Sequence, residues 1–279
     1  MKKNWQTFGH NFNKQLLDKQ ISSGKLFHAY VFMGPAGIGK QTLAREFAGK
    51  LLAASSLYNH PDFHFFDAEA AESVEQVREF IGRLGKKPFL ANFNFAVIDS
   101  AELLNKESSN ALLKTMEEPT LRTVIVLVAQ TRNLLPTILS RCVTLNFAPL
   151  SESEFTAFAT SRAVKDESVI KLSLRNPGKL QWLLDGDTDS KQWKDYLDLL
   201  QKAQVGPMSE KLLAVDRLAS LDQAKLKQLL SWWQERRKLF LTANPADYAL
   251  LKNISESSAL LNTAMNKKNI LQKLLVTSN

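Results

Sequence analysis

A buried strand that runs directly into a glycine-rich loop constrains the fold more than any other feature of this 279-residue chain. Residues 29–33 are a short run of β-branched, aromatic and other apolar residues, which predicts a strand buried on both faces. A loop follows at once, ends at Lys40, and contains Gly34, Gly37 and Gly39. A helix is predicted directly after the loop, and the order strand, loop, helix is typical of α/β proteins.

The spacing of these glycines and the lysine predicts a phosphate cradle. Gly34, Gly39 and Lys40 fit the first seven positions of G-x-x-x-x-G-K-[ST], in which backbone N–H groups surround a phosphate. The eighth position is Gln41, and its amide is a poor substitute for a hydroxyl that binds Mg²⁺. Thr42 comes one residue late, about 100° further around the helix, so we expect its hydroxyl to point away. The alternative is a turn that binds no ligand.

Strand and helix patterns alternate over the first 150 residues. Strands are predicted at 29–33, 63–66, 93–99, 123–129 and 143–147. Helices are predicted at 11–22, 41–54, 73–84 and 101–118, with one more helical turn that begins at Pro136. This alternation predicts a parallel five-stranded sheet with right-handed crossovers and helices on both faces.

Asp99 ends the third predicted strand, at the carboxyl edge where open parallel sheets bind their ligands. A carboxylate there suits a role toward Mg²⁺, and it also suits the cap of the next helix. The acid that polarises water in ATPases of this type normally comes next, but Ser100 stands there and Glu102 lies two positions further on. The candidate nucleotide site therefore has a phosphate cradle and lacks parts of the hydrolytic machinery.

The strand pattern stops after Pro149, and the rest of the chain is predicted to be helical. Helices are predicted at 151–163, 166–174, 178–185, 191–203, 209–219, 222–242 and 247–276. An Asn-Pro-Gly turn at 176–178 interrupts the first group, and 186–189 is predicted as a linker. The chain is thus predicted to contain an α/β domain (1–150) and two all-α domains (151–188 and 189–279).

Composition excludes several classes of site. One cysteine, Cys142, excludes an internal disulfide and a multi-cysteine zinc site, and the four histidines are scattered. No apolar run is long enough to span a membrane, and no signal peptide is indicated, so we expect a cytoplasmic protein. The net charge is +8, but basic residues exceed acidic ones by four on each side of residue 150 (17 against 13, then 19 against 15). This even spread favours solvated surfaces over a dedicated nucleic-acid patch.

Three segments in order resemble one family: 34–40 (Gly-Pro-Ala-Gly-Ile-Gly-Lys), 110–119 (Asn-Ala-Leu-Leu-Lys-Thr-Met-Glu-Glu-Pro) and 135–142 (Leu-Pro-Thr-Ile-Leu-Ser-Arg-Cys). They are similar to the AAA+ subunits of the bacterial clamp loader of DNA polymerase III. The resemblance is specific up to about residue 150 and rests on helical pattern beyond it. It implies an AAA+ domain, a lid and an oligomerising collar over the three predicted domains. It also implies a hetero-pentamer that opens a sliding clamp and places it on primed DNA.

Departures from that family pattern carry further implications. The hydrolysing subunits are expected to have a hydroxyl at Gln41, a glutamate at Ser100 and an arginine near Gln181. All three are missing, so the chain resembles the delta-prime type of subunit, which is not itself a motor. Many relatives carry four zinc-binding cysteines before the second strand, and here 55–62 is a shortened connection, so we expect no zinc. The resemblance implies that no cofactor is required, although a degenerate loop can still hold ATP or ADP.

Arg141 is the residue to which the resemblance gives a catalytic role. In similar chains the arginine of Ser-Arg-Cys reaches the ATP site of a neighbouring subunit, as an arginine finger in trans. A guanidinium suits this role because it is always charged and its planar fork matches phosphate oxygens. The alternative is an arginine that caps the preceding helix or forms a surface ion pair. For the whole chain, the alternatives are an active motor subunit of the same assembly and a P-loop kinase acting on a small molecule.

Overall fold

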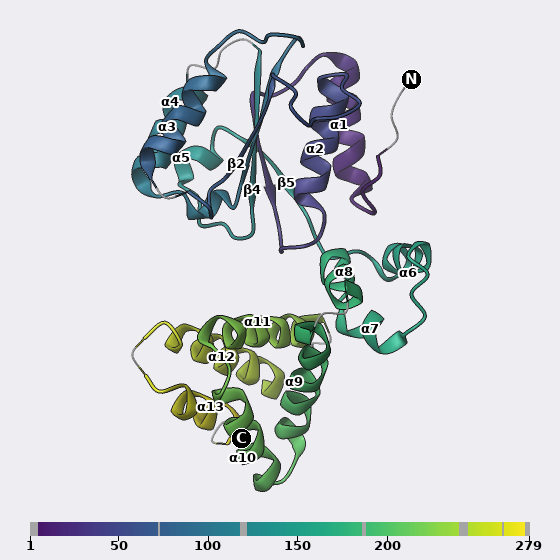
Figure 1. The fold of residues 1–279 in the computed structure, drawn as a ribbon, viewed down its shortest axis with the longest axis vertical. Coiled ribbons are helices and arrows are strands. Elements are labelled where there is room, and N and C mark those ends of the chain that lie inside the picture. Colours follow the sequence, from purple (N-terminus) through teal and green to yellow (C-terminus); the bar gives the residue numbers. More distant parts are fainter. Residues whose placement is uncertain are drawn as a thin grey trace. The chain divides into compact units, whose positions relative to one another are not determined.

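The computed structural model describes residues 5–71, 73–117, 122–185, 188–239, 245–263 and 265–276. The chain divides into two compact units (Figure 1). The first comprises residues 1–164 together with 175–178, and the second comprises residues 165–174 together with 179–279. The predicted domain boundaries after residues 150 and 188 remain predictions.

A parallel five-stranded sheet forms the centre of the first unit and confirms the predicted fold class. Its strands are β1 (Ala29–Met33), β2 (Phe63–Asp67), β3 (Asn94–Asp99), β4 (Thr123–Ala129) and β5 (Val143–Asn146). Their order across the sheet is β2-β3-β4-β1-β5, and every neighbouring pair is parallel. Every residue of β1 and β4 is buried. Burial on both faces explains why these strands are continuous apolar runs.

Helices cover both faces of the sheet (Figure 1). One face packs against α1 (Asn11–Ser23) and α2 (Lys40–Leu51), and its core includes Phe32, Phe47 and Phe95. The other face packs against α3 (Val74–Leu84), α4 (Lys106–Glu117) and α5 (Pro136–Leu139). Alternate residues of β1, β3 and β4 therefore supply two separate cores, because successive side chains of a strand point to opposite faces.

The prediction of one continuous helix at 101–118 is wrong for residues 101–105. A short 3₁₀ helix, η1 (Ala101–Leu103), precedes α4, which begins only at Lys106. The side chain of Asn105 accepts a hydrogen bond from the backbone N–H of Ser108 at 2.8 Å and so caps the new helix. The predicted end of this helix, at Glu118 and Pro119, lies outside the described residues.

α6 (Glu152–Ser161) continues the first unit after β5. It begins with a capping box, in which Ser151 and Glu154 satisfy each other's backbone N–H groups. Phe158 of α6 packs edge-on against Phe8, with 5.1 Å between the ring centroids. The first turns after the sheet are thus tied to the N-terminal segment.

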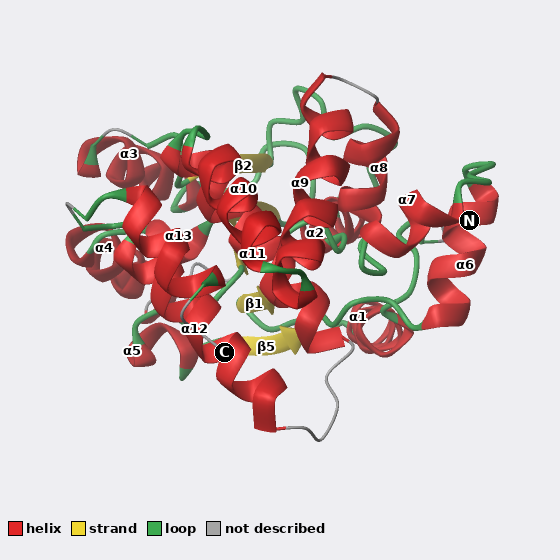
Figure 2. Cartoon of the chain, turned by 90° about the horizontal axis from the view of Figure 1, so that it is seen from below, coloured by secondary structure: helices red, strands yellow, loops and turns green. Residues whose placement is uncertain are grey.

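The described part of the second unit is helical (Figure 2). Its helices are α7 (Glu167–Leu172), α8 (Pro177–Asp185), α9 (Thr188–Val205), α10 (Met208–Ala219), α11 (Gln223–Leu239), α12 (Pro245–Leu260) and α13 (Lys267–Leu275). The first two residues of α8 belong to the first unit. Leucines and the rings of Trp193 and Trp232 form one continuous core. Among the described helices, none combines the length and apolar character needed to cross a membrane.

Two predictions for this region are wrong. The helix predicted at 247–276 is two helices, because the Asn266 side chain accepts from the backbone N–H of Lys268 and caps α13. A side chain that offers this bond starts a new helix in place of continuing the old one. The linker predicted at 186–189 is helical from Thr188 onward, and its first two residues lie outside the described residues, as do residues 240–242 of the helix predicted at 222–242.

Candidate functional site

The glycine loop lies between β1 and α2, at the carboxyl edge of the sheet, as predicted. The backbone of Gly37 (φ 75°) and of Gly39 (φ 97°) is left-handed, a conformation that favours glycine. A Cβ atom on Gly37 would lie 2.6 Å from the side-chain oxygen of Asn176. The N–H of Gly34 donates to the carbonyl of Ala129, at the end of β4, at 3.1 Å. The loop is therefore hydrogen-bonded to the sheet, and Asn176 packs closely against it.

The Lys40 side chain turns back onto the loop that precedes it. Its Nζ donates to the carbonyl of Gly34 at 2.6 Å and to that of Pro35 at 2.5 Å. The residue is only 5% exposed. Burial lowers the pKa of Lys40 to about 8, although the charges of Asp99 and Glu102 act in the opposite direction. A lysine that serves phosphate oxygens would have to leave both carbonyls.

The Asn-Pro-Gly turn lies against the outer side of the same loop. The Asn176 Nδ2 donates to the carbonyl of Ala36 at 2.7 Å, and the Gly178 N–H donates to the carbonyl of Gly37 at 2.8 Å. A Cβ atom on Gly178 would lie 2.6 Å from the Gly37 Cα. The two glycines thus allow two backbones to touch, and the turn belongs to the first unit although helix α8 continues into the second.

The N-terminal segment contacts the remaining part of the loop. His10 donates from Nε2 to the carbonyl of Ile38 at 2.7 Å, and burial lowers the pKa of this histidine. The Thr7 side chain lies against Gly39, and its N–H donates to Glu46 at 2.9 Å. With the first helical bond of α2, each carbonyl from residue 34 to residue 39 accepts a hydrogen bond from the protein. The carbonyl groups of the loop are thus all hydrogen-bonded within the chain itself.

Gln41 and Asp99 meet where a metal ion would be bound in a hydrolysing site. The Gln41 Nε2 donates to Asp99 Oδ2 at 2.8 Å, and the N–H of Ser100 donates to Oδ1 at 3.0 Å. Mg²⁺ requires oxygen ligands in near-octahedral geometry, and an amide N–H directed at the carboxylate takes up that position. Thr42 is exposed on α2. These residues do not fit a bound Mg²⁺.

Two other polar groups are also engaged elsewhere. Glu102 accepts from the backbone N–H of Gln130, after the end of β4, at 2.9 Å. Gln181 donates to Asp185 within helix α8 at 2.8 Å. Neither side chain takes the place of the missing acid or the missing arginine in the described structure.

Arg141 lies at the amino ends of the parallel strands, whereas the glycine loop lies at their carboxyl ends. In the β1–β5 register Val143 pairs with Tyr30 and Asn146 pairs with Met33, so β5 begins where β1 begins. Arg141 precedes β5 by two residues, whereas Gly34 follows the end of β1. At about 3.3 Å per residue, roughly 20 Å separate the two levels. The chain's own arginine therefore cannot serve its own loop.

The Arg141 guanidinium is held at two points. Nη2 donates to Glu117 Oε1 at 2.7 Å, and Nη1 donates to the carbonyl of Thr137 at 3.1 Å. The Arg141 side chain is 36% exposed. Burial raises the pKa of the neighbouring Cys142 thiol to about 12, which makes it an inert cysteine. In the isolated chain Arg141 thus both caps the preceding helix and forms a surface ion pair, the two contacts of the alternative to a catalytic role.

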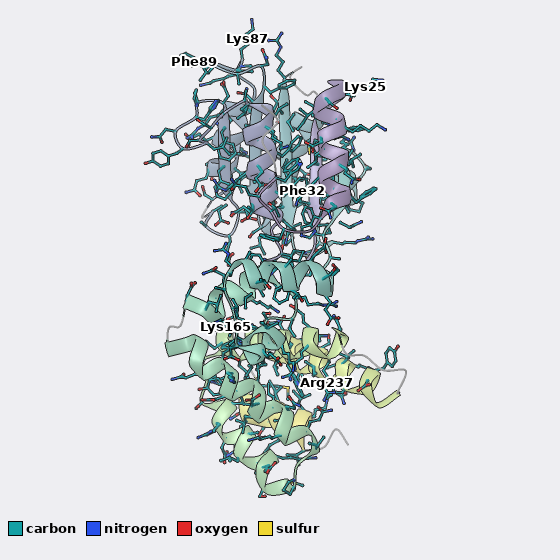
Figure 3. All side chains as sticks on the ribbon, turned by 90° about the vertical axis from the view of Figure 1, so that its right-hand side faces the viewer. Lys25, Phe32, Lys87, Phe89, Lys165 and Arg237 are labelled. Atoms are coloured by element: carbon teal, nitrogen blue, oxygen red, sulfur yellow. The ribbon has the colours of Figure 1, made fainter. Side chains whose placement is uncertain are left out.

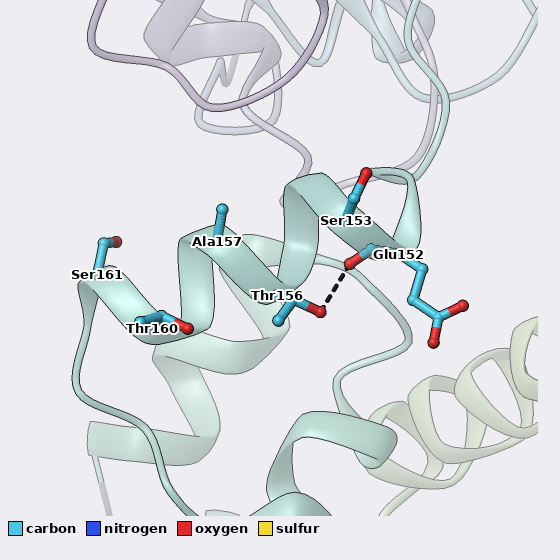
Figure 4. A pocket seen from close by; sticks show the side chains of 6 residues that line it. All are labelled: Glu152, Ser153, Thr156, Ala157, Thr160 and Ser161. Carbon is cyan, nitrogen blue, oxygen red and sulfur yellow. Dashed lines mark hydrogen bonds between the residues drawn. The ribbon is translucent and has the colours of Figure 1, made fainter.

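Two further surface features carry no assigned chemistry. A shallow depression along α6 is lined by Glu152, Ser153, Thr156, Ala157, Thr160 and Ser161 (Figure 4). All six belong to one helix and include a single charged group. At the other feature, the exposed Phe89 (Figure 3) follows a basic pair in a loop whose backbone N–H groups at 89–91 donate to the buried Asp62.

Sequence reasoning missed Asp62, Glu117 and the contact of the 176–178 turn with the loop. The segment ending at Asp62 was predicted as a surface connection, but that carboxylate is 2% exposed. An Asn-Pro-Gly sequence signals a turn and gives no indication of its partner. The described residues hold no group of three or more histidine, cysteine, aspartate or glutamate side chains that could bind a metal.

The parallel sheet, the loop at its carboxyl edge and the helical second unit give an AAA+-like fold with a P-loop. The family model described as "DNA polymerase III, delta subunit" matches residues 9–151, about half of the chain. The chain belongs to this family, and its resemblance to the delta-prime subunit is confirmed.

Individual relatives agree with this assignment. The chain is 37% identical over 160 residues to DNA polymerase III subunit delta′ of Pseudomonas aeruginosa, covering 50% of this chain and 48% of that protein. It is 32% identical over 153 residues to the tau/gamma subunit of Haemophilus influenzae, covering 49% of this chain and 22% of that protein. The structure of the Thermotoga maritima RuvB Holliday junction branch migration motor shares the fold, with a TM-score of 0.51 at 17% identity, over 95% of this chain and 87% of that one.

The chain spans about half the length of the Pseudomonas aeruginosa delta′ subunit and about a fifth of the length of the Haemophilus influenzae tau/gamma subunit. What the whole relatives do is therefore carried to this chain only as a proposal.

Proposed function

We propose that the chain is a delta-prime-like subunit of a clamp loader in DNA replication. In this proposal it assembles with motor and clamp-opening subunits as a hetero-pentamer in the cytoplasm, and the assembly places a sliding clamp on primed DNA. The chain hydrolyses no ATP itself and requires no zinc. It supplies Arg141 in trans to the ATP site of a neighbouring motor subunit.

The hydrogen bond from Gln41 to Asp99, at 2.8 Å, is the observation that supports the absence of hydrolysis. It places an amide donor where phosphoryl transfer needs a metal ligand. Lys40 bonds to two loop carbonyls, and the position of the water-polarising acid is Ser100. Nucleotide can still bind to the loop glycines without being turned over.

The position of Arg141 supports a role toward a second subunit. It lies at the amino ends of the strands, away from the loop of the same chain, and its side chain is partly exposed. Arginine fingers supplied in trans contribute about 10³ to 10⁵ in rate in GTPases, whereas an exposed ion pair contributes at most about 1 kcal/mol to stability. The two roles therefore predict effects of very different size.

The experiment compares wild-type and Arg141→Ala chains, each assembled with wild-type motor and clamp-opening subunits. The isolated chain is expected to hydrolyse ATP at background rate. The Arg141→Ala assembly is expected to form normally and to lose DNA- and clamp-stimulated hydrolysis at one site. Total hydrolysis falls only in part because other sites remain, so single-site turnover and clamp loading are the sharper measurements.

Two outcomes would contradict the proposal. Turnover by the isolated chain at the rate of a motor subunit, abolished by Lys40→Ala, would show that it is itself a motor. Wild-type clamp loading by the Arg141→Ala assembly would show that the arginine is structural. Arg83→Ala is the matched control, because Arg83 forms a surface ion pair of 2.6 Å with Glu79 on α3.

A further inference from the structure

Glu117 is the side chain that fixes the orientation of the Arg141 guanidinium. It accepts from Nη2 at 2.7 Å, while the carbonyl of Thr137 accepts from Nη1 at 3.1 Å. Two acceptors on two different helices define the plane of a guanidinium group, because its donors have a rigid fork geometry. An arginine carries five N–H donors, and these two bonds leave the others of the fork available for a further oxyanion.

The elements that carry these acceptors are firmly packed. Glu117 is the last described residue of α4 and follows the buried Met116, and Thr137 lies in α5 next to the fully buried Ile138. Both helices contribute to the same core below the sheet face. The backbone of both anchor residues is therefore held by the core, although the ion pair itself is on the surface.

We propose that Glu117 is a positioning residue, which holds Arg141 pre-oriented for the phosphate oxygens of a nucleoside triphosphate bound to a neighbouring subunit. This inference rests on the proposed function of Arg141. Orientation acts on the transition state, so loss of Glu117 lowers the rate constant at that site and leaves the apparent affinity for ATP unchanged.

The test uses the full chain assembled with wild-type partner subunits, DNA and clamp, with single-site ATP turnover as the readout. Glu117→Ala is expected to lower kcat about fivefold, the size of effect that one exposed ion pair supports, at unchanged KM. Glu117→Gln keeps an acceptor oxygen and is expected to restore about half of the loss. Glu79→Ala, which breaks the Arg83 ion pair of 2.6 Å on α3, is the matched control and leaves turnover unchanged.

A double variant separates this inference from the function on which it depends. In the Arg141→Ala background, Glu117→Ala is expected to have no further effect, because there is no guanidinium left to orient. If Arg141→Ala alone leaves turnover unchanged, the proposed function fails. If Arg141→Ala lowers turnover but Glu117→Ala does not, or raises it, the function stands and the positioning role is overturned. A further loss in the double variant also overturns it.

Discussion

Lys40 places an ammonium group in a setting where its charge is costly. The side chain is 5% exposed, and its Nζ bonds to two neutral carbonyls. Desolvation of the charge is the main reason that the pKa falls to about 8 from 10.5. In a hydrolysing P-loop the phosphates would supply the missing negative charge. Here the lysine stabilises the shape of the loop and carries an electrostatic penalty at neutral pH.

The free energy of unfolding is therefore expected to depend on pH through Lys40. Between pH 8 and 10.5 the unfolded chain binds more protons at this residue than the folded chain, so stability rises with pH in this window. Relative to Lys40→Met, the wild-type chain should gain about 3 kcal/mol across the window. Urea denaturation at a series of pH values measures the difference. A stability difference between the wild-type chain and Lys40→Met that stays constant across the pH series would exclude the effect.

At the scale of elements, the 176–178 turn and the glycine loop form one packed substructure. Gly178→Ala would bring a Cβ atom to 2.6 Å from Gly37 Cα and 2.8 Å from its carbonyl oxygen. We expect the variant to lose about 1 to 3 kcal/mol of stability, as in other overpacked sites. Thermal or urea unfolding followed by circular dichroism measures this loss. Gly82→Ala in α3 is the control, since its Cβ would meet no atom within 4 Å, and it should be neutral or stabilising.

Most elements were predictable because their periodicity is local. All five strands and the loop before Lys40 were predicted from apolar runs and glycine spacing. The breaks near Asn105 and Asn266 were not, because each depends on whether one side chain caps a helix or remains solvated. The contact of Gly178 with Gly37 joins residues about 140 positions apart, and one sequence contains no signal for such a pairing.

The candidate site shows the same division between local and distant information. Gln41 was recognised as a wrong residue for a metal from its position alone, but its bond to Asp99 depends on two strands lying in one sheet. Glu117 could not be connected to Arg141 because the pair is formed by tertiary packing of α4 and α5. Residue types were thus predictable, and their partners were not.

At the scale of the whole molecule, the chain is expected to fold without zinc. Structural zinc sites need four ligands, and the single Cys142 is partly buried with a pKa raised to about 12. Elemental analysis of chelator-washed protein should find no stoichiometric zinc, and the melting temperature should be the same with and without chelator. Zinc at one equivalent per chain would contradict the expectation.

The distribution of tryptophans between the two units has an optical consequence. Trp182, Trp193 and Trp232 pack against one another in the second unit, with ring centroids 5.5 to 5.8 Å apart, and Trp233 is buried in the same core. Trp5 alone lies in the first unit, where its indole N–H donates to Asp18. Tryptophan fluorescence therefore reports mostly on the helical unit, and Trp5→Phe would leave a tryptophan signal from that unit alone. The difference between the wild-type and Trp5→Phe melting curves then reports on the first unit, so the two proteins together show whether the units melt together or in sequence.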